Sequence, residues 1–239
     1  MNAIWHDVEC AAYVADLDVW RDLAGGVAGP VLDLGCGTGR VALDLAARGH
    51  DVTGLDSDRA LVEALRSRAD AQGLTVATSV ADVRSFELGR RFGLAISPMQ
   101  VVQLLGGPDG RAKMLASVRR HLEPGGVFAL AVANPFDDWS DEESLPPLPD
   151  VREQDGWVYS STPLAVRRAG DAFVIDRRRQ AVSPDGQLEE ELTTITLDSL
   201  PAEALEREAA QAGFGVLPRR TVAETADYVG SDVVVLEAR

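Results

Sequence analysis

The run VLDLGCGTGR, residues 31–40, constrains the fold more than any other stretch of the chain. Its apolar start, 31–34, predicts a buried strand, and a short helical pattern begins at Arg40. Three glycines alternate between the two: Gly35, Gly37 and Gly39. Glycine costs backbone entropy, which is tolerated where the chain must turn sharply or another group must approach the backbone. We interpret the run as a strand–turn–helix unit whose turn faces a ligand.

Short apolar runs and helical patterns keep alternating to about residue 133, which predicts βα units and a parallel sheet. The expected strands are 31–34, 51–56, 74–80, 94–96 and 127–132. The expected helices are 40–48, 59–72 and 110–122, with a later helix at 201–212 and closing strands at 216–222 and 232–236. A length of 239 residues suits one α/β domain.

The alternation of strand and helix patterns ends after the fifth expected strand. Residues 137–156 are acidic and contain prolines without any helical or strand period, which predicts an exposed loop. Three strand-like runs follow at 157–168, 172–182 and 187–197, separated by good turn formers. We therefore expect an antiparallel meander inserted into the α/β domain.

Three arginines in this meander are expected to lie opposite three glutamates. Residues 177–179 are all Arg and residues 189–191 are all Glu. Opposite charges on neighbouring strands form cross-strand ion pairs, which is our interpretation here. The alternative is a basic patch that binds a partner.

The N-terminal segment, 1–29, shows a helical spacing. Tyr13, Leu17 and Trp20 lie at i, i+4 and i+7, which predicts an amphipathic helix. This helix either packs on the core or forms a lid over the ligand, with the Tyr13 ring facing a cation.

Composition excludes several classes. The formal charge of −15 disfavours nucleic acid and anionic membranes as partners. No apolar run reaches the roughly 20 residues that span a bilayer, and the start has no signal-peptide pattern, so we expect a cytoplasmic protein. Cys10 and Cys36 lack metal-ligand spacing, so no metal is expected.

Carboxylates follow three of the expected strands. Asp56 ends the second strand about 20 residues after the glycine turn, where a carboxylate binds a ribose diol. Asp33, in the first strand, suits a ligand amine and would repel a pyrophosphate. Asp82 follows the third strand, where it could accept from an adenine amino group. Read from Gly37, the turn also satisfies the dinucleotide pattern G-x-G-x-x-A, which alone is a weak signal for NAD.

Taken in order, VLDLGCGTGR, VTGLDSD, VADVRSF and LEPGGVFALAVA resemble the class I S-adenosylmethionine-dependent methyltransferases. The resemblance implies a Rossmann-like, mostly parallel sheet of seven strands in the order 3-2-1-4-5-7-6. It implies one methyltransferase domain over 1–239, with a core at 30–136 and 198–239. Residues 1–29 would be a helical lid, and 157–197 the inserted strands.

The resemblance also implies a site. S-adenosylmethionine would be bound by Tyr13, Asp33, Gly35, Cys36, Gly37, Thr38, Gly39, Asp56, Ser57, Asp82, Val83 and Ser97. The segment 97–100, Ser-Pro-Met-Gln, would flank the sulfonium and the acceptor, and Gln100 and Gln103 are candidates for orienting the acceptor. The catalytic group stays open among Tyr13, His6 and Gln100.

The inserted strands are similar to those of small-molecule members, including sugar-amine N-methyltransferases. The Asn/Asp-Pro-Pro-Tyr signature of many nucleic-acid and protein N-methyltransferases is replaced by SPMQ. We therefore expect methyl transfer to nitrogen or oxygen of a small metabolite, releasing S-adenosylhomocysteine. Two alternatives stay open: an NAD-dependent oxidoreductase, and a non-catalytic S-adenosylmethionine-binding protein. The inserted strands would roof the acceptor site or form a homodimer surface.

Overall fold

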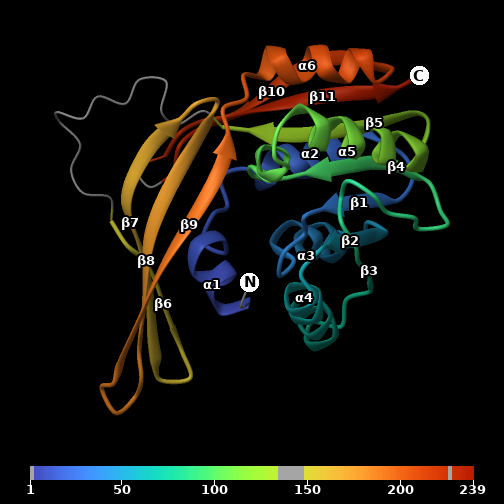
Figure 1. Ribbon diagram of the computed structural model, residues 1–239. Coiled ribbons are helices and arrows are strands. Elements are labelled where there is room, and N and C mark those ends of the chain that lie inside the picture. Colours follow the sequence, from blue (N-terminus) through green and yellow to red (C-terminus); the bar gives the residue numbers. More distant parts are fainter. Residues whose placement is uncertain (1–2, 134–147, 226–227) are drawn as a thin grey trace.

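The computed structural model describes residues 3–133, 148–225 and 228–239, which form two sheets (Figure 1). The larger sheet has seven strands in the order β10-β11-β5-β4-β1-β2-β3. Their bounds are β1 Val31–Leu34, β2 Val52–Asp56, β3 Val76–Val80, β4 Phe92–Ser97, β5 Leu122–Val132, β10 Phe214–Val222 and β11 Ser231–Ala238. Numbered within this sheet, the order is 3-2-1-4-5-7-6, and the seventh strand, β11, runs antiparallel to both of its neighbours. The predicted Rossmann-like fold is confirmed.

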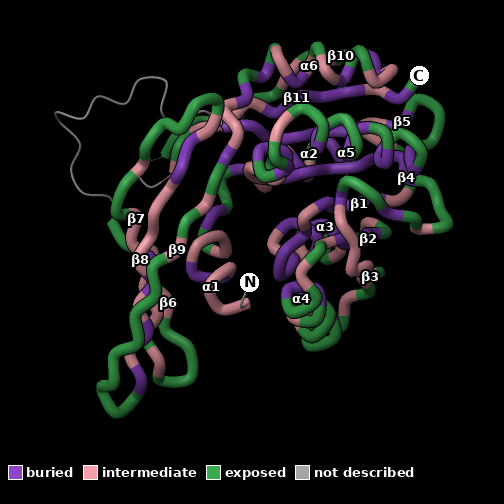
Figure 2. The backbone as a smooth tube through the Cα atoms, viewed as in Figure 1, coloured by how far each residue is buried: buried purple, intermediate pink, exposed green. Residues whose placement is uncertain are grey.

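Helices cover both faces of this sheet. They are α2 Leu17–Gly26, α3 Arg40–Ala47, α4 Arg59–Ala71, α5 Pro108–His121 and α6 Ala202–Gln211, with a short 3-10 helix, η1, at Val101–Leu104. The first helix, α1 Ala3–Cys10, packs instead against the inserted sheet and α4. Every residue of β1 and β4 is buried, as expected for parallel strands covered on both faces (Figure 2). None of the described helices is long and apolar enough to cross a membrane.

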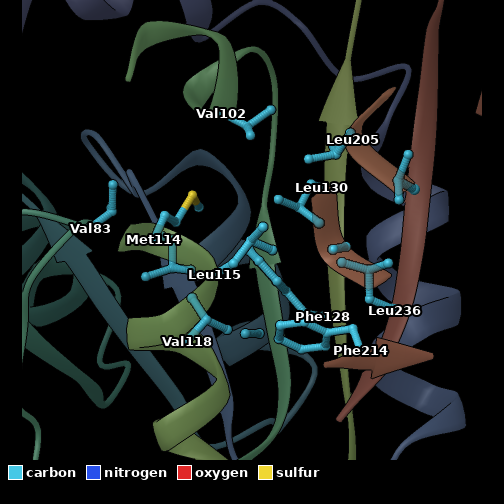
Figure 3. Packing of buried hydrophobic residues seen from close by; sticks show 14 of the residues in the cluster. Val83, Val102, Met114, Leu115, Val118, Phe128, Leu130, Leu205, Phe214 and Leu236 are labelled. Carbon is cyan, nitrogen blue, oxygen red and sulfur yellow. The ribbon is translucent and has the colours of Figure 1, made fainter. Parts of the chain in front are cut away.

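One hydrophobic cluster packs α5 and α6 against the sheet (Figure 3). Met114 and Leu115 of α5 and Leu205 of α6 belong to this cluster. So do Phe128 of β5 and Phe214 of β10, whose ring centroids lie 6.3 Å apart. A second cluster packs α2 and α3 on the other face. These two clusters hold the strand ends in place, and the strand ends carry the site.

The N-terminal segment differs from the predicted helix. Tyr13 lies in a turn after α1, where its amide donates to the Cys10 carbonyl at 3.2 Å, and α2 begins only at Leu17. The buried Asp16 side chain fixes this turn, because it accepts from the Trp20 indole at 2.8 Å and from Arg40. Trp20 is fully buried, so α2 packs on the core. The prediction of one continuous helix that includes Tyr13, Leu17 and Trp20 was therefore wrong.

The inserted sheet has four strands where three were predicted. They are β6 Asp150–Gln154, β7 Trp157–Ala169, β8 Ala172–Val182 and β9 Leu188–Asp198, all antiparallel. The additional strand, β6, lies in the stretch expected to be a loop, and Asp155 and Gly156 join it to β7 with φ of 53° and 78°. Two residues with positive φ make a hairpin turn that suits the twist of the strands. Residues 137–147 of the predicted loop lie outside the described residues.

The predicted register of the three arginines was wrong by two residues, and the predicted cross-strand ion pairs form only in part. Arg178 lies opposite Leu192, yet its Nε comes within 4.0 Å of a carboxylate oxygen of Glu190. Arg177 lies opposite Thr193, and Arg179 lies opposite Glu191. Successive side chains on a strand point to opposite faces of the sheet. Arg177 and Arg179 therefore share one face, which lies against α1, and both approach Glu9 there.

Candidate functional site

A cavity of about 580 Å³ lies at the carboxyl ends of β1, β2 and β4. One wall comes from these strand ends, and the opposite wall comes from β8 and β9 of the inserted sheet, with α1 closing one side. In Figure 1, α1 lies between the inserted sheet and the helices α3 and α4. Open α/β sheets bind ligands at this edge. The cavity wall includes ten residues of the predicted site and its neighbourhood: His6, Asp33, Gly35, Cys36, Asp56, Ser57, Asp82, Val83, Met99 and Gln100.

The glycine turn is approached by the protein itself. Gly37 has φ +55°, and a Cβ there would lie 2.2 Å from Nε2 of His6. Gly35 has φ +70°, and a Cβ there would lie 2.6 Å from Cγ2 of Val101. Unlike Gly37, it also lines the cavity. The Thr38 hydroxyl donates to Asp7 of α1 at 2.8 Å. Gly37, Thr38 and Gly39 are absent from the cavity wall. The close approach that was predicted for a ligand at Gly37 is made by His6.

Asp56 holds the turn and keeps acceptor capacity. Its Oδ2 accepts from the Gly37 amide at 3.0 Å, and its Oδ1 accepts from the Asp58 amide at 2.9 Å. Burial raises the pKa of Asp56, and the Gly37 amide opposes that shift. An ionised carboxylate has about four acceptor sites. With a further backbone hydrogen bond from Ser57, at least one acceptor site remains for a hydroxyl donor in the cavity.

Asp33 is the least satisfied group of the site. It is 1% exposed, and neither of its carboxylate oxygens makes a hydrogen bond within the described residues. Burial raises its pKa to about 7, although the nearby Arg40 guanidinium opposes this. A buried polar group without a partner costs about 1–3 kcal/mol, and more when charged. Because Asp33 lines the cavity, a cationic hydrogen-bond donor bound there would supply the partner that its carboxylate lacks.

Asp82 and Val83 form the outer rim of the cavity. Asp82 is 42% exposed at its side chain and is paired with Arg84, with 2.6 Å between Nη2 and Oδ2. Hydrogen bonds from this arginine lower the pKa of Asp82. Sequence reasoning missed Arg84. An adenine amino group at this rim would share the Asp82 carboxylate with it.

The segment after β4 splits into buried and cavity-facing residues. Ser97 is fully buried outside the cavity wall, and its hydroxyl has no partner among the described residues. Met99 adopts φ 57°, a left-handed conformation that is costly for a residue with a Cβ. Gln100 and Met99 line the cavity. Gln103 is structural, because its side-chain amide makes two hydrogen bonds with the backbone of Ala133. Its Nε2 donates to the Ala133 carbonyl at 2.8 Å, and its Oε1 accepts from the Ala133 amide at 2.9 Å.

Tyr13 lies in a smaller cavity of about 50 Å³ that shares Met99 and Gln100 with the main one. The Arg40 guanidinium lies 5.1 Å from its ring centroid, so a cation already faces this ring. His6 does line the main cavity, with Nδ1 at 3.3 Å from the Thr38 hydroxyl. Burial lowers the pKa of His6, so its imidazole is neutral at pH 7.

The wall opposite the strand ends was not predicted residue by residue. It is apolar at Ile175, Ile195 and Leu197, and polar at Glu9 and Arg177. The signal was present in the alternation of residues 173, 175, 177 and 179 along β8. Among the described residues, no group of three His, Cys, Asp or Glu side chains is arranged to hold a metal.

Two curated relatives resemble the chain. A 2-heptyl-1-hydroxyquinolin-4(1H)-one methyltransferase from Mycobacteroides abscessus is 32% identical over 156 residues, covering 62% of this chain and 68% of the relative. A dTDP-3-amino-3,4,6-trideoxy-alpha-D-glucopyranose N,N-dimethyltransferase from Streptomyces venezuelae is 31% identical, covering 60% and 52%. The chain spans only 28% to 68% of the length of the first curated relatives it matches.

Among solved structures, an amino pentose methyltransferase from Micromonospora echinaspora, with S-adenosylmethionine bound, has a TM-score of 0.67 and 25% identity. It matches over 98% of this chain and 92% of that one. The model of a methyltransferase domain family matches residues 31–126, which include the glycine turn, Asp56 and Asp82. Sheet order, site and relatives agree, and the chain belongs to the class I S-adenosylmethionine-dependent methyltransferase family.

Proposed function

We propose that the protein methylates a small molecule at nitrogen or oxygen, with nitrogen favoured, and releases S-adenosylhomocysteine. The observation that carries the proposal is one cavity with two unlike walls. The strand ends supply the unpartnered Asp33 and the acceptor sites of Asp56, whereas the inserted sheet supplies Ile175 and Ile195. The first wall suits a cationic nucleoside cofactor, and the second leaves room for an acceptor.

Each residue has a defined part in this proposal. Asp33 accepts from the cofactor's ammonium group, Asp56 accepts from its ribose hydroxyls, and Val83 packs against its base. S-adenosylmethionine supplies a methyl carbon on a positively charged sulfur, which a nucleophile attacks in line. Gln100 faces the acceptor, and the inserted sheet forms the wall against which the acceptor packs.

Nitrogen is favoured because the cavity offers positioning, and among the described residues that line it the one histidine, His6, is packed on the glycine turn. Correct alignment contributes about 7–11 kcal/mol, whereas a general base contributes a factor of about 10²–10⁴. A neutral amine needs no base to attack. His6, the nearest histidine, packs on the Gly37 turn and contacts Thr38. Two relatives are named as methyltransferases of amino sugars, which supports the same choice.

Thermal unfolding with S-adenosylhomocysteine, with NAD and with neither ligand tests the cofactor. A ligand at about 100 times its Kd adds about 2.7 kcal/mol, which for a chain of this size is a rise of roughly 5–10 °C in Tm. We expect this rise with S-adenosylhomocysteine alone. It should shrink in Asp56→Ala and persist in Asp70→Ala, which changes an exposed aspartate of α4.

A rise with NAD alone would overturn the proposal in favour of an oxidoreductase. If S-adenosylhomocysteine binds, a labelled methyl donor and a panel of amines, phenols and alcohols then test turnover. Tight binding without turnover of any acceptor class would support the non-catalytic alternative.

A further inference from the structure

The inner face of the inserted sheet forms a continuous wall on the acceptor side of the cavity. Ile175 of β8 lies opposite Ile195 of β9, and Leu197 is the next inward-facing residue along β9. All three line the cavity. Arg177 follows Ile175 on the same face of β8, so a guanidinium stands directly beside this apolar surface.

Arg177 is held in place from one side. Its Nη2 donates to Asp150 of β6, and its Nε donates to the Ser161 hydroxyl of β7 at 2.9 Å. The side chain is 15% exposed, and Nε lies 3.7 Å from Glu9 of α1. Within the described residues, Nη1 makes no hydrogen bond. A guanidinium whose back is fixed and whose Nη1 is free is already organised to bind an oxygen ligand.

Arg40 and Arg84, the other two arginines of the cavity wall, lie on the cofactor side and are each paired with an aspartate. Arg40 binds both oxygens of Asp16, at 2.5 and 2.8 Å, and Arg84 binds Asp82. Arg179 binds both oxygens of Glu9, at 2.8 and 3.0 Å, and lies outside the cavity wall. Among the described residues, Arg177 is the one cation that the inserted sheet presents to the cavity.

We propose, on the basis of the function proposed above, that Nη1 of Arg177 binds an oxyanion carried by the acceptor. The acceptor is then a molecule with a carboxylate or phosphate group and an apolar body that packs on Ile175, Ile195 and Leu197. Charge-assisted bonds from arginine to these groups are roughly twice as strong as neutral hydrogen bonds. Binding at Arg177 turns the opposite end of the acceptor toward the strand ends, where the methyl group is presented.

Four probes with one apolar body test the proposal. Phenylacetate, benzyl phosphate, benzyl alcohol and benzylamine are titrated by calorimetry into the protein saturated with S-adenosylhomocysteine. We expect at least one anionic probe to bind about tenfold more tightly than the alcohol and the amine, the gain expected of a charged hydrogen bond. Comparing the two anionic probes tells a carboxylate acceptor from a phosphate acceptor.

A matched pair of variants locates the effect. R177Q should abolish the preference for the anion, whereas R178Q should keep it, because Arg178 lies on the outer face of the same strand. Both variants should keep the wild-type Kd for S-adenosylhomocysteine, which reports folding and tests the cofactor site separately. If R177Q no longer binds S-adenosylhomocysteine with the wild-type Kd, R177K serves as the second variant. It keeps the positive charge but lacks the planar pair of donors, so we expect its affinity for the anionic probe to fall by several fold. Equal affinity for the four probes, no binding of either anion, or an unchanged preference in the Arg177 variants would overturn the proposal.

Discussion

At the scale of single residues, Asp33 makes the sharpest prediction. Burial raises its pKa to about 7, compared with 3.8 for a free side chain. The folded protein therefore holds a proton that the unfolded chain has lost between about pH 4 and pH 7, so this group destabilises the fold as pH rises through that window. At about 1.4 kcal/mol per pKa unit the full penalty is roughly 4 kcal/mol, reached above pH 7.

The substitution D33N removes this titration at nearly constant volume. We expect the unfolding free energy of D33N, measured in urea, to rise relative to that of the wild type between about pH 4 and pH 7, and the difference to level off above pH 7. Subtracting the two curves cancels the other carboxylates, including Asp7 and Asp82, whose pKa values are lowered. A difference that does not change with pH would show that Asp33 stays ionised in the folded protein. The gain in Tm from S-adenosylhomocysteine should be smaller in D33N, because the ammonium group loses its carboxylate.

Much of the residue-level site could be predicted, because its carboxylates lie at or just after the carboxyl ends of three neighbouring parallel strands. Asp33, Asp56 and Asp82 all reach the cavity wall. What sequence could not show is which neighbour fills the space above each glycine. His6 covers Gly37 across a separation of 31 positions, and no local pattern encodes that contact. The ion pair between Asp82 and Arg84 could have been predicted from the sequence, since the two residues are only two positions apart.

At the scale of elements, α1 joins the inserted sheet to the core. Asp7 binds Arg68 of α4 and the Thr38 hydroxyl, while Glu9 binds Arg179 and the Ser161 hydroxyl. Asp7 and Glu9 lie two residues apart on one short helix. Asp7 binds these residues of the core, and Glu9 binds these residues of the inserted sheet. The helix therefore acts as a bridge, and its position determines how the cavity is closed.

Removing Glu9 should separate the inserted sheet from α1. Glu9 and Arg179 are 8% and 9% exposed at their side chains, and breaking a buried pair by removing one partner costs about 3–5 kcal/mol. We expect E9A to lose roughly that much unfolding free energy in urea, and R178A, which breaks a surface pair, to lose less than about 0.5 kcal/mol. Adding R179A to E9A should recover part of the loss, because the stranded charge is gone. Equal effects of E9A and R178A would mean that the bridge is not a stabilising contact.

The inserted sheet shows why element boundaries were easier to predict than register. Turn formers marked three of its strands, and Asp155-Gly156 carried the signal for the fourth, masked by the acidic and proline-bearing residues before it. The arginine register depended on the length of the turn between β8 and β9, which places Val182 opposite Leu188. Shifting the pairing by two residues keeps the same faces but changes every partner. Glu191 is thus the cross-strand neighbour of Arg179, but the guanidinium of Arg179 binds the carboxylate of Glu9 instead.

At the scale of the whole molecule, the acceptor side of the cavity exists only while the inserted sheet is held against the core. The parallel core was predictable because its strands are locally apolar, but the cavity is closed by segments far apart in the chain. Besides α1, a second attachment lies at the end of β9. Asp198 accepts from Arg111 of α5 at 2.6 Å and from the Gly107 amide at 2.8 Å. Arg111 is buried and also binds Glu208 of α6, at 2.7 Å.

This double pairing of Arg111 allows attachment to be separated from stability. D198A and E208A each remove one carboxylate from the same guanidinium, so we expect similar losses of about 2–4 kcal/mol in unfolding free energy. Only D198A releases the inserted sheet, because Glu208 connects α5 to α6 within the core. Hydrogen exchange at the amides of β8 and β9 should therefore accelerate strongly in D198A and little in E208A. The cofactor-side wall belongs to the core, so S-adenosylhomocysteine should bind both variants with similar Kd, whereas binding of any acceptor-side probe should weaken in D198A alone. Uniform acceleration across both sheets in both variants would instead mean that the two sheets unfold as one cooperative unit.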